Sequence, residues 1–219
     1  MNSKLELGMC HDKEAIEARS EIYRILSGVF AYPASDEQKT FVLQEAQAAL
    51  RAAATGLPFP LPALDALTEW GAETALDVQS EYTRLFDNCS GRPALSLHEK
   101  DFSAVDQKKL WEELIRYYEH FGLRYDLKDC KEWPDHIGIE LEFLHYLTFL
   151  EGTVPDALTE DYVAAEGDFL DRHLAKWVPG FSQRLSDGDA SSPYGAFSQV
   201  LAQFIVGDRE FIQLRRSIQ

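Results

Sequence analysis

Apolar residues recur every three to four positions along most of this 219-residue chain. Capping and helix-breaking residues separate these stretches, and no stretch alternates apolar and polar residues as a half-buried strand would. The run from Val105 to Phe121 is an example, with Gly122 following at the position of a helix C-cap. The period predicts an all-α protein, a helical bundle of roughly eight to ten helices.

The breaks in the pattern predict where individual helices begin and end. Ser35, with Gln38 three residues later, has the spacing of a capping box. Residues 56–62 are a proline-rich connection, and residues 88–93 and 186–193 are expected to be loops. We expect helices over residues 12–30, 41–54, 63–70, 77–86, 105–121, 135–151, 160–176 and 194–206, followed by a short C-terminal piece.

The N-terminal residues differ from the rest of the chain. Residues 1–11 lack a clear helical stripe, so we expect a flexible leader followed by a single all-helical domain over residues 12–219. They also lack the apolar core of a secretory signal, and no run of 18 or more apolar residues occurs anywhere. We therefore expect a cytoplasmic protein without membrane insertion.

The charge balance narrows the choice of partner. The chain carries 37 acidic and 21 basic side chains, a formal net charge of −16. Such a chain repels phosphate backbones and anionic membrane surfaces, so nucleic acid is not an expected partner. A basic partner is favoured. The three cysteines, Cys10, Cys89 and Cys130, are far apart and include no C-x-x-C pair, which argues against a disulfide framework or a zinc site.

One cluster of chemically active residues lies after Trp133. His136 and Glu140 are four residues apart, and Glu142 and His145 are three apart. The second spacing is half of the motif that binds metal in di-iron helical bundles, but the chain has no second E-x-x-H. The alternative to a metal site is a core helix whose acids face solvent.

A second cluster is Glu81–Phe86, where Tyr82, Leu85 and Phe86 share one helix face. These three side chains either pack in the core or line a groove for a partner helix. The chain has no phosphate-binding loop, no dinucleotide fingerprint and no nucleophile elbow. We therefore expect no enzymatic activity, no catalytic residues, no metal and no cofactor of its own.

Three segments in a fixed order carry a family resemblance. Glu81–Phe86 has the form E-Y-x-x-L-F, and about 50 residues later Pro134–Phe143 has the form P-D-H-x-x-x-E-L-E-F. Phe169–Trp177 then has the form F-x-x-x-H-L-x-x-W. Together they resemble the TorD/DmsD/NarJ family of molybdoenzyme maturation chaperones. The segment Pro93–Glu99 resembles the branch that serves type II dimethyl-sulfoxide-reductase-like enzymes.

The resemblance implies two helical subdomains with a hinge at residues 122–134. It also implies that the chain binds the apo catalytic subunit of a molybdenum oxidoreductase, its twin-arginine signal peptide, or both. Binding would assist insertion of the molybdenum cofactor and prevent premature export. The residues implied for partner binding are Tyr82, Leu85, Phe86, Trp133, Pro134, Asp135, His136, Glu140, Glu142 and Phe143.

The charge of the chain agrees with this expectation, because a basic and apolar leader calls for an acidic receptor with an apolar groove. Two alternatives remain open at this point. One is a metal-carboxylate enzyme using His136, Glu140, Glu142 and His145, and the other is a helical adaptor with a different client. The chain is expected to be a monomer or a homodimer.

Overall fold

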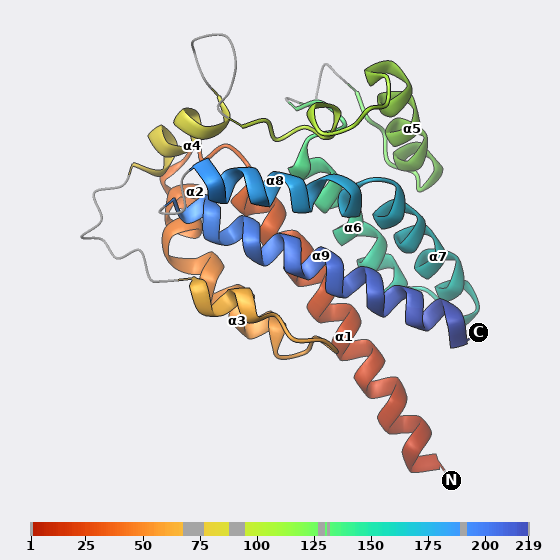
Figure 1. Ribbon diagram of the computed structural model, residues 1–219. Helices are drawn as coiled ribbons and strands as arrows, with labels where there is room; N and C mark the ends of the chain where they lie inside the picture. Colours follow the sequence, from red (N-terminus) through yellow and green to blue (C-terminus); the bar gives the residue numbers. More distant parts are fainter. Residues whose placement is uncertain are drawn as a thin grey trace.

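The computed structural model describes residues 2–67, 77–87, 95–126, 130, 132–188 and 192–218 (Figure 1). The α-helices are α1 (Asn2–Val29), α2 (Asp36–Thr40), α3 (Ala46–Ala54), α4 (Val78–Phe86), α5 (Gln107–His120), α6 (Ile137–Thr153), α7 (Asp156–Arg172), α8 (Leu174–Gly188) and α9 (Pro193–Ile218). A π-helical segment covers Phe41–Glu45, and 3₁₀ turns cover Pro62–Ala66 and Glu99–Asp101.

The all-helical prediction is confirmed. The described residues contain no β-strand, and their only bridge of strand type joins His98 and His136. The predicted capping box is also present, formed by Ser35 and Gln38. Asp106 caps α5 by accepting from the amide of Lys109. The expected loop at residues 88–93 lies outside the described residues.

The long helices pack side by side around one apolar core. Helix α1 packs along α6, and α8 packs along α9, with α7 in contact with α6, α8 and α9 (Figure 1). One continuous cluster of buried apolar side chains draws on α1 and on α3 to α9. Because this burial removes a large apolar area from water, it supplies the main stabilisation of the bundle. The division into two subdomains at residues 122–134 stays a prediction.

Several helix boundaries differ from the expected ones. Helix α1 begins at Asn2, whereas a start near Asp12 was expected, so residues 2–11 are helical. The N-terminal end of α1 projects beyond the other helices (Figure 1). Residues 63–66 form a 3₁₀ turn where an α-helix over residues 63–70 was expected, and residues 68–70 lie outside the described part. Helix α9 continues to Ile218, where a break after Val206 was expected.

The continuation of α9 has a packing reason. A Cβ atom at Gly207 would lie 2.5 Å from the ring of Phe59. This glycine therefore lets the ring pack against the helix, and it does not end the helix as its propensity suggests.

A whole helix was also missed. The sequence predicted one helix over residues 160–176 that ended near Pro179, but the chain breaks at His173 and α8 follows from Leu174 with Pro179 inside it. Trp177, Val178 and Phe181 are buried in the core. Their packing outweighs the cost of a proline within the helix.

A buried ion cluster joins four of the long helices. The guanidinium group of Arg19 on α1 pairs with Glu151 on α6 at 3.0 Å, and also with Glu166 on α7 and Asp208 on α9. All four side chains are fully buried. Tyr23 donates a hydrogen bond of 2.5 Å to Asp208. The cluster fixes the register of these helices, because any shift would leave a buried charge without its partner.

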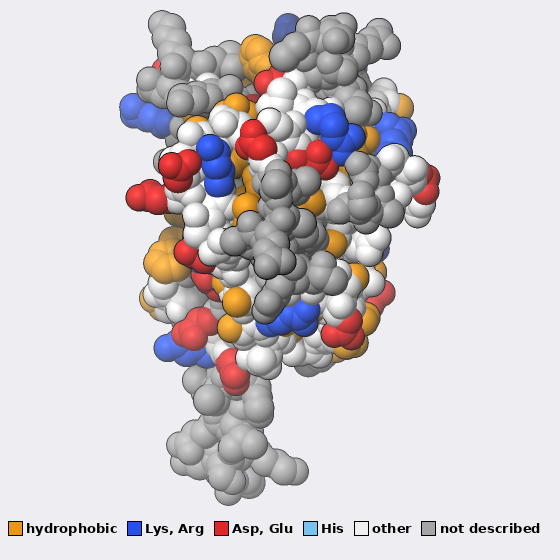
Figure 2. Space-filling model, turned by 90° about the vertical axis from the view of Figure 1, so that its left-hand side faces the viewer, with side chains coloured by type: hydrophobic (Ala, Val, Ile, Leu, Met, Phe, Trp, Pro, Cys, Tyr) orange, Lys and Arg blue, Asp and Glu red, His pale blue; other side chains and the backbone are white. Residues whose placement is uncertain are grey.

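Two properties of the surface bear on partners. No helix among the described residues is long and apolar enough to cross a membrane. On the face that carries α2, α3 and α4, acidic and basic side chains are interspersed and do not form a patch of one sign (Figure 2). Among the residues shown in colour, this face has no concentration of acidic side chains that would account for the net charge of −16.

Candidate functional site

The segment before α6 is held against the segment that follows α4. The amide of Glu99 donates a hydrogen bond of 3.0 Å to the carbonyl oxygen of Asp135. The amide of Ile137 donates one of 2.9 Å to the carbonyl oxygen of Leu97. The carboxylate of Asp135 also accepts from the amide of Lys100 at 3.2 Å. These bonds fix the start of α6 relative to residues 97–100.

Asp135 is the anchor of this junction. Its side chain is 0% exposed, and its Oδ1 lies 3.4 Å from Nδ1 of His98. Although burial acts in the opposite direction, the contact with His98 and the bond from Lys100 lower the pKa of the Asp135 carboxyl. Asp135 therefore stays ionised and its position is set by the groups around it.

His136 caps α6 and is uncharged. Its Nδ1 accepts a hydrogen bond of 3.1 Å from the amide of Gly138, so the ring proton lies on Nε2. Burial, and then the charge of His98, lowers the pKa of His136 to about 3. The backbone at Gly138 is close to α1, because the hydroxyl of Ser27 donates to its carbonyl oxygen at 3.0 Å.

A hollow of about 480 Å³ lies between α4 and this junction, and we call it the α4–α6 hollow. Tyr82 and Phe86 of α4 line it together with His136. The rings of Tyr82 and Phe86 meet edge to face, with centroids 5.1 Å apart. Two motifs that are about 50 residues apart in the sequence therefore contribute to one cavity.

Charged groups surround the same hollow. Asp87, Asp101 and Glu132 contribute carboxylates, and Lys100 and His98 contribute basic groups. Burial raises the pKa of the Glu132 carboxyl, and the charge of Asp87 raises it further while His98 lowers it. A cation that entered the hollow would relieve the repulsion between these two acids.

Trp133, next to Glu132, is 43% exposed and is the most accessible of the predicted site residues with an aromatic ring. Its ring stacks on that of Trp111 from α5, with centroids 4.5 Å apart and an interplanar angle of 14°. The Nζ atom of Lys100 lies 5.5 Å from the centre of the Trp111 ring. The stack holds the Trp133 ring in place while leaving part of it open to a partner.

A buried polar cluster supports the junction from behind. Glu99 contacts Nδ1 of His173 at 2.8 Å, and Glu140 accepts from Nε1 of Trp177 at 3.2 Å. Burial, followed by the charge of Glu99, raises the pKa of the Glu140 carboxyl well above its usual range. This shift favours the protonated form of Glu140 and so reduces the repulsion between two neighbouring buried acids.

This cluster was not predicted from the sequence, because Glu99, Glu140 and His173 lie in three separate segments. Glu140 and His173 lie in two of the three segments that carry the family resemblance, and Glu99 is the last residue of the segment Pro93–Glu99 that carries the branch resemblance. Their positions in these segments were the available signal.

The ten predicted partner-binding residues do not form one surface. Tyr82, Phe86 and His136 line the α4–α6 hollow, and Trp133 is exposed next to the lining residue Glu132. Five further predicted residues are buried inside the protein and do not line this hollow: Leu85, Pro134, Asp135, Glu140 and Phe143. Glu142 is exposed and lines a different hollow of about 300 Å³ beside Tyr146 and Phe149.

The metal-site alternative finds no support in the geometry. His145 contacts the hydroxyl of Ser20 at 2.9 Å, whereas Glu140 faces Trp177 and Glu142 faces solvent. Within the described part of the chain, no group of three or more metal-binding side chains converges. The expectation that the acids of α6 are all solvated was wrong for Glu140 and Glu151, which are both buried.

The fold is that of a known class of helical proteins. The structure matches that of a redox enzyme maturation protein from Archaeoglobus fulgidus with a TM-score of 0.51 and 21% sequence identity. The match covers 85% of this chain and 93% of that chain. At this identity the match shows the fold alone.

Residues 42–183 match the family described as nitrate reductase delta subunit. The chain is 35% identical over 150 residues to the selenate reductase assembly chaperone protein of Thauera selenatis. The aligned region covers 65% of this chain and 76% of that protein. It is 34% identical over 138 residues to the chlorate reductase assembly chaperone protein of Ideonella dechloratans, covering 62% of this chain and 68% of that protein.

The chain belongs to the nitrate reductase delta subunit family, a TorD/NarJ-like family. The resemblance drawn from the three sequence motifs is thereby confirmed. The branch expectation is also met, because the two relatives carry the names of selenate and chlorate reductases.

Proposed function

We propose that this chain is a system-specific assembly chaperone that acts in the cytoplasm on the catalytic subunit of a molybdenum oxidoreductase. It holds the apo subunit until the molybdenum cofactor is inserted, and it prevents premature export. Support comes from the family match and from relatives named as assembly chaperones of selenate and chlorate reductases. In this role the chain binds and releases its client and catalyses no reaction of its own.

The α4–α6 hollow is the proposed contact site. The single observation that carries this assignment is that Tyr82, Phe86 and His136, from two separate motifs, line one cavity. Trp133, exposed next to Glu132 at its edge, adds an aromatic surface of the kind that dominates protein interfaces.

The chemistry of the hollow favours a basic and apolar segment. Asp87, Asp101 and Glu132 attract cations, and the exposed Trp133 ring binds a guanidinium group well. A twin-arginine signal peptide has this composition, and we assign it as the segment that enters the hollow. Asp135 is a positioning residue in this proposal, because it is buried and acts by fixing the junction that presents His136 and Trp133.

The test begins with the identity of the client. Full-length chain purified from its native host should bring with it a molybdenum-enzyme catalytic subunit, identified by mass. The N-terminal leader of that subunit is then titrated as a synthetic peptide by calorimetry. Trp133→Ala and Glu132→Gln are expected to weaken binding at least about tenfold each, the range of an interface hot spot.

Leu214→Ala is the matched control, since Leu214 on α9 is 58% exposed and does not line the hollow. Equal peptide affinity in the wild type and both site variants would remove the site assignment. A native-host partner that is not a molybdenum-enzyme subunit would remove the proposed function itself.

A further inference from the structure

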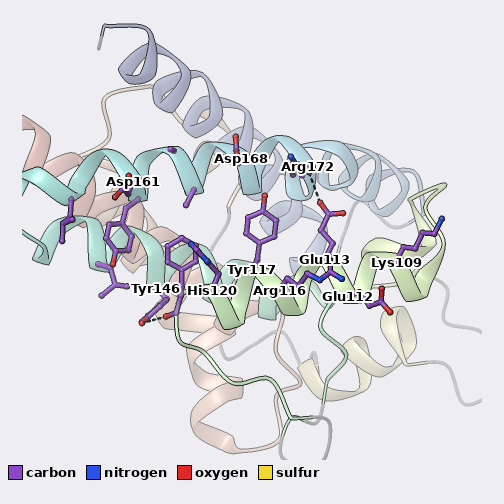
Figure 3. A pocket seen from close by; sticks show the side chains of 16 residues that line it. Lys109, Glu112, Glu113, Arg116, Tyr117, His120, Tyr146, Asp161, Asp168 and Arg172 are labelled. Carbon is purple, nitrogen blue, oxygen red and sulfur yellow. Dashed lines mark hydrogen bonds and ion pairs between the residues drawn. The ribbon is translucent and has the colours of Figure 1, made fainter.

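A second and larger hollow lies on another part of the molecule. It has a volume of about 1350 Å³ between α5 and α7, and we call it the α5–α7 groove (Figure 3). No residue lines both this groove and the α4–α6 hollow. Pockets for small ligands occupy roughly 300–1,000 Å³, so the groove is large for a metabolite and suits a segment of polypeptide.

The groove exists because aromatic rings hold α5 away from its neighbours. Tyr117 meets Phe169 of α7 edge to face, with ring centroids 5.3 Å apart. Phe121 lies 5.8 Å from Tyr162, again between ring centroids. Rings of this size separate the two helices by more than direct backbone packing would. The space between them has an aromatic floor.

The floor continues into an exposed apolar area at the start of α7. Leu158 lines the groove and is 47% exposed, and Leu150 and Tyr162 line it nearby. At the other end, Arg172 of α7 donates to Glu113 of α5 at 3.2 Å (Figure 3). This ion pair joins α5 and α7 at a distance from the exposed Leu158.

Both rims carry mixed charges. On α5 the rim presents Arg116 and His120, and on α7 it presents Asp161 and Asp168 (Figure 3). Helix α5 also contributes Lys109, Glu112 and Glu113, and α7 also contributes Arg172. Asp168 is also 3.4 Å from Arg216 of α9, an exposed pair. Among the described residues, no ion pair joins Arg116 to the acids of α7. Both rims are therefore available to a third, charged element placed between them.

We propose that the α5–α7 groove binds an amphipathic helix of the client subunit, outside its N-terminal leader. The apolar face of that helix lies on the ring floor, with acidic side chains towards Arg116 and basic side chains towards Asp161 and Asp168. This inference rests on the proposed function and adds a second contact to it. A helix in a groove of this type gains affinity from apolar anchors and orientation from the charged rims.

The position of α5 supports the same client for both sites. Tyr117 faces the groove, while the next residue, Tyr118, donates to the carbonyl oxygen of Pro134 at 2.8 Å. One helix thus contacts the groove on one side and the Pro134–His136 turn on the other. Two contacts with one client raise the effective concentration of each segment at its site.

A second copy of this chain is a less suitable occupant. In a two-fold dimer each copy would have to place a projecting element of its own surface in the groove of the other. A convex helix fills the space.

The experiment uses the full chain and the catalytic subunit that co-purifies with it from the native host. That subunit is expressed without its leader, and its affinity is measured for the wild type, Leu158→Glu, Arg116→Glu and the control Leu214→Glu. Leu158 and Leu214 are both exposed, so the two glutamates test position and not hydrophobicity alone. Circular dichroism and thermal unfolding check that all variants are folded.

We expect Leu158→Glu and Arg116→Glu to weaken binding of the leaderless subunit by about tenfold or more, with the control unchanged. Binding of the isolated leader peptide should stay within about twofold in every variant, because the groove is separate from the α4–α6 hollow.

If the subunit without its leader binds the wild type and all variants with equal affinity, the groove proposal is overturned and the proposed function is unaffected. A dimer that Leu158→Glu converts to a monomer, without loss of client affinity, would also overturn it in favour of self-association. If no molybdenum-enzyme subunit co-purifies at all, both proposals fail.

Discussion

The amide of Glu99 donates a hydrogen bond of 3.0 Å to the carbonyl oxygen of Asp135, although the two residues belong to separate segments. Together with the bond from Ile137 to Leu97, it places the start of α6 against residues 97–99. The proposed client site depends on this junction, because it positions His136 in the α4–α6 hollow.

Replacement of Asp135 by alanine should therefore destabilise the fold. The substitution leaves the amide of Lys100 without its carboxylate partner and opens a cavity in a buried site. We expect a loss of about 2 kcal/mol in the free energy of unfolding, measured by urea denaturation. Asp87→Ala, which removes an exposed carboxylate, should change it by less than about 0.5 kcal/mol. Similar values for the two variants would contradict the anchoring role of Asp135.

The pH dependence of stability should report the burial of His136. Its pKa is about 3 in the folded chain, whereas an unfolded histidine titrates near 6.5. As the pH falls below about 6.5, the unfolded state takes up a proton that the folded state does not, so stability falls.

His136→Asn keeps an oxygen that can accept from the amide of Gly138 but removes this titration. The stability of the wild type relative to this variant should fall by up to about 1.4 kcal/mol for each pH unit between pH 6 and pH 4. Denaturation curves at these pH values give the difference directly. Parallel pH profiles would show that His136 is accessible to protons in the folded chain.

Tryptophan fluorescence should change when the client leader binds. Trp133 is partly exposed in its stack on Trp111, and an occupant of the adjacent hollow alters the surroundings of its ring. Trp133→Phe should abolish most of the emission change. Trp177→Phe should retain it, since Trp177 is buried against Glu140. A change that survives in the Trp133→Phe protein would place the leader elsewhere.

The ion cluster around Arg19 offers a test of what joins the long helices. Arg19→Met removes the only guanidinium that contacts Glu151, Glu166 and Asp208 together in the described part of the chain. We expect a loss of about 3–5 kcal/mol or failure to fold, because buried carboxylates lose their counter-charge.

The control for Arg19 is Arg24→Met on the same helix. Arg24 forms an exposed ion pair with Glu21 at 2.6 Å, so its removal should cost less than about 1 kcal/mol. Comparable losses in the two proteins would mean that the buried cluster adds little to stability.

The sequence was informative where local rules decide the structure. The capping box at Ser35 follows from short-range spacing, and it is present. Local rules failed where tertiary packing overrides propensity. Proline and glycine disfavour helices, but Pro179 lies within α8, where Phe181 is buried, and Gly207 lies within α9, where Phe59 packs against the backbone.

The candidate site was predictable only in part. Tyr82 and His136 could be assigned to one site because both lie in segments that carry the family resemblance, and they do line one hollow. The contact between Glu99 and His173 joins residues that are 74 positions apart, and no local pattern encodes it. Charge and periodicity likewise gave no sign of the α5–α7 groove, which depends on how far aromatic rings separate two helices.

The most direct test of the central claim is the molybdenum content of the client subunit in host cells that lack this chain. The subunit is purified from the deletion strain and from strains complemented with the wild type or with Trp133→Ala. We expect molybdenum well below stoichiometric in the deletion strain, full recovery with the wild type and poor recovery with Trp133→Ala. A fully loaded client in the absence of the chain would contradict the central claim.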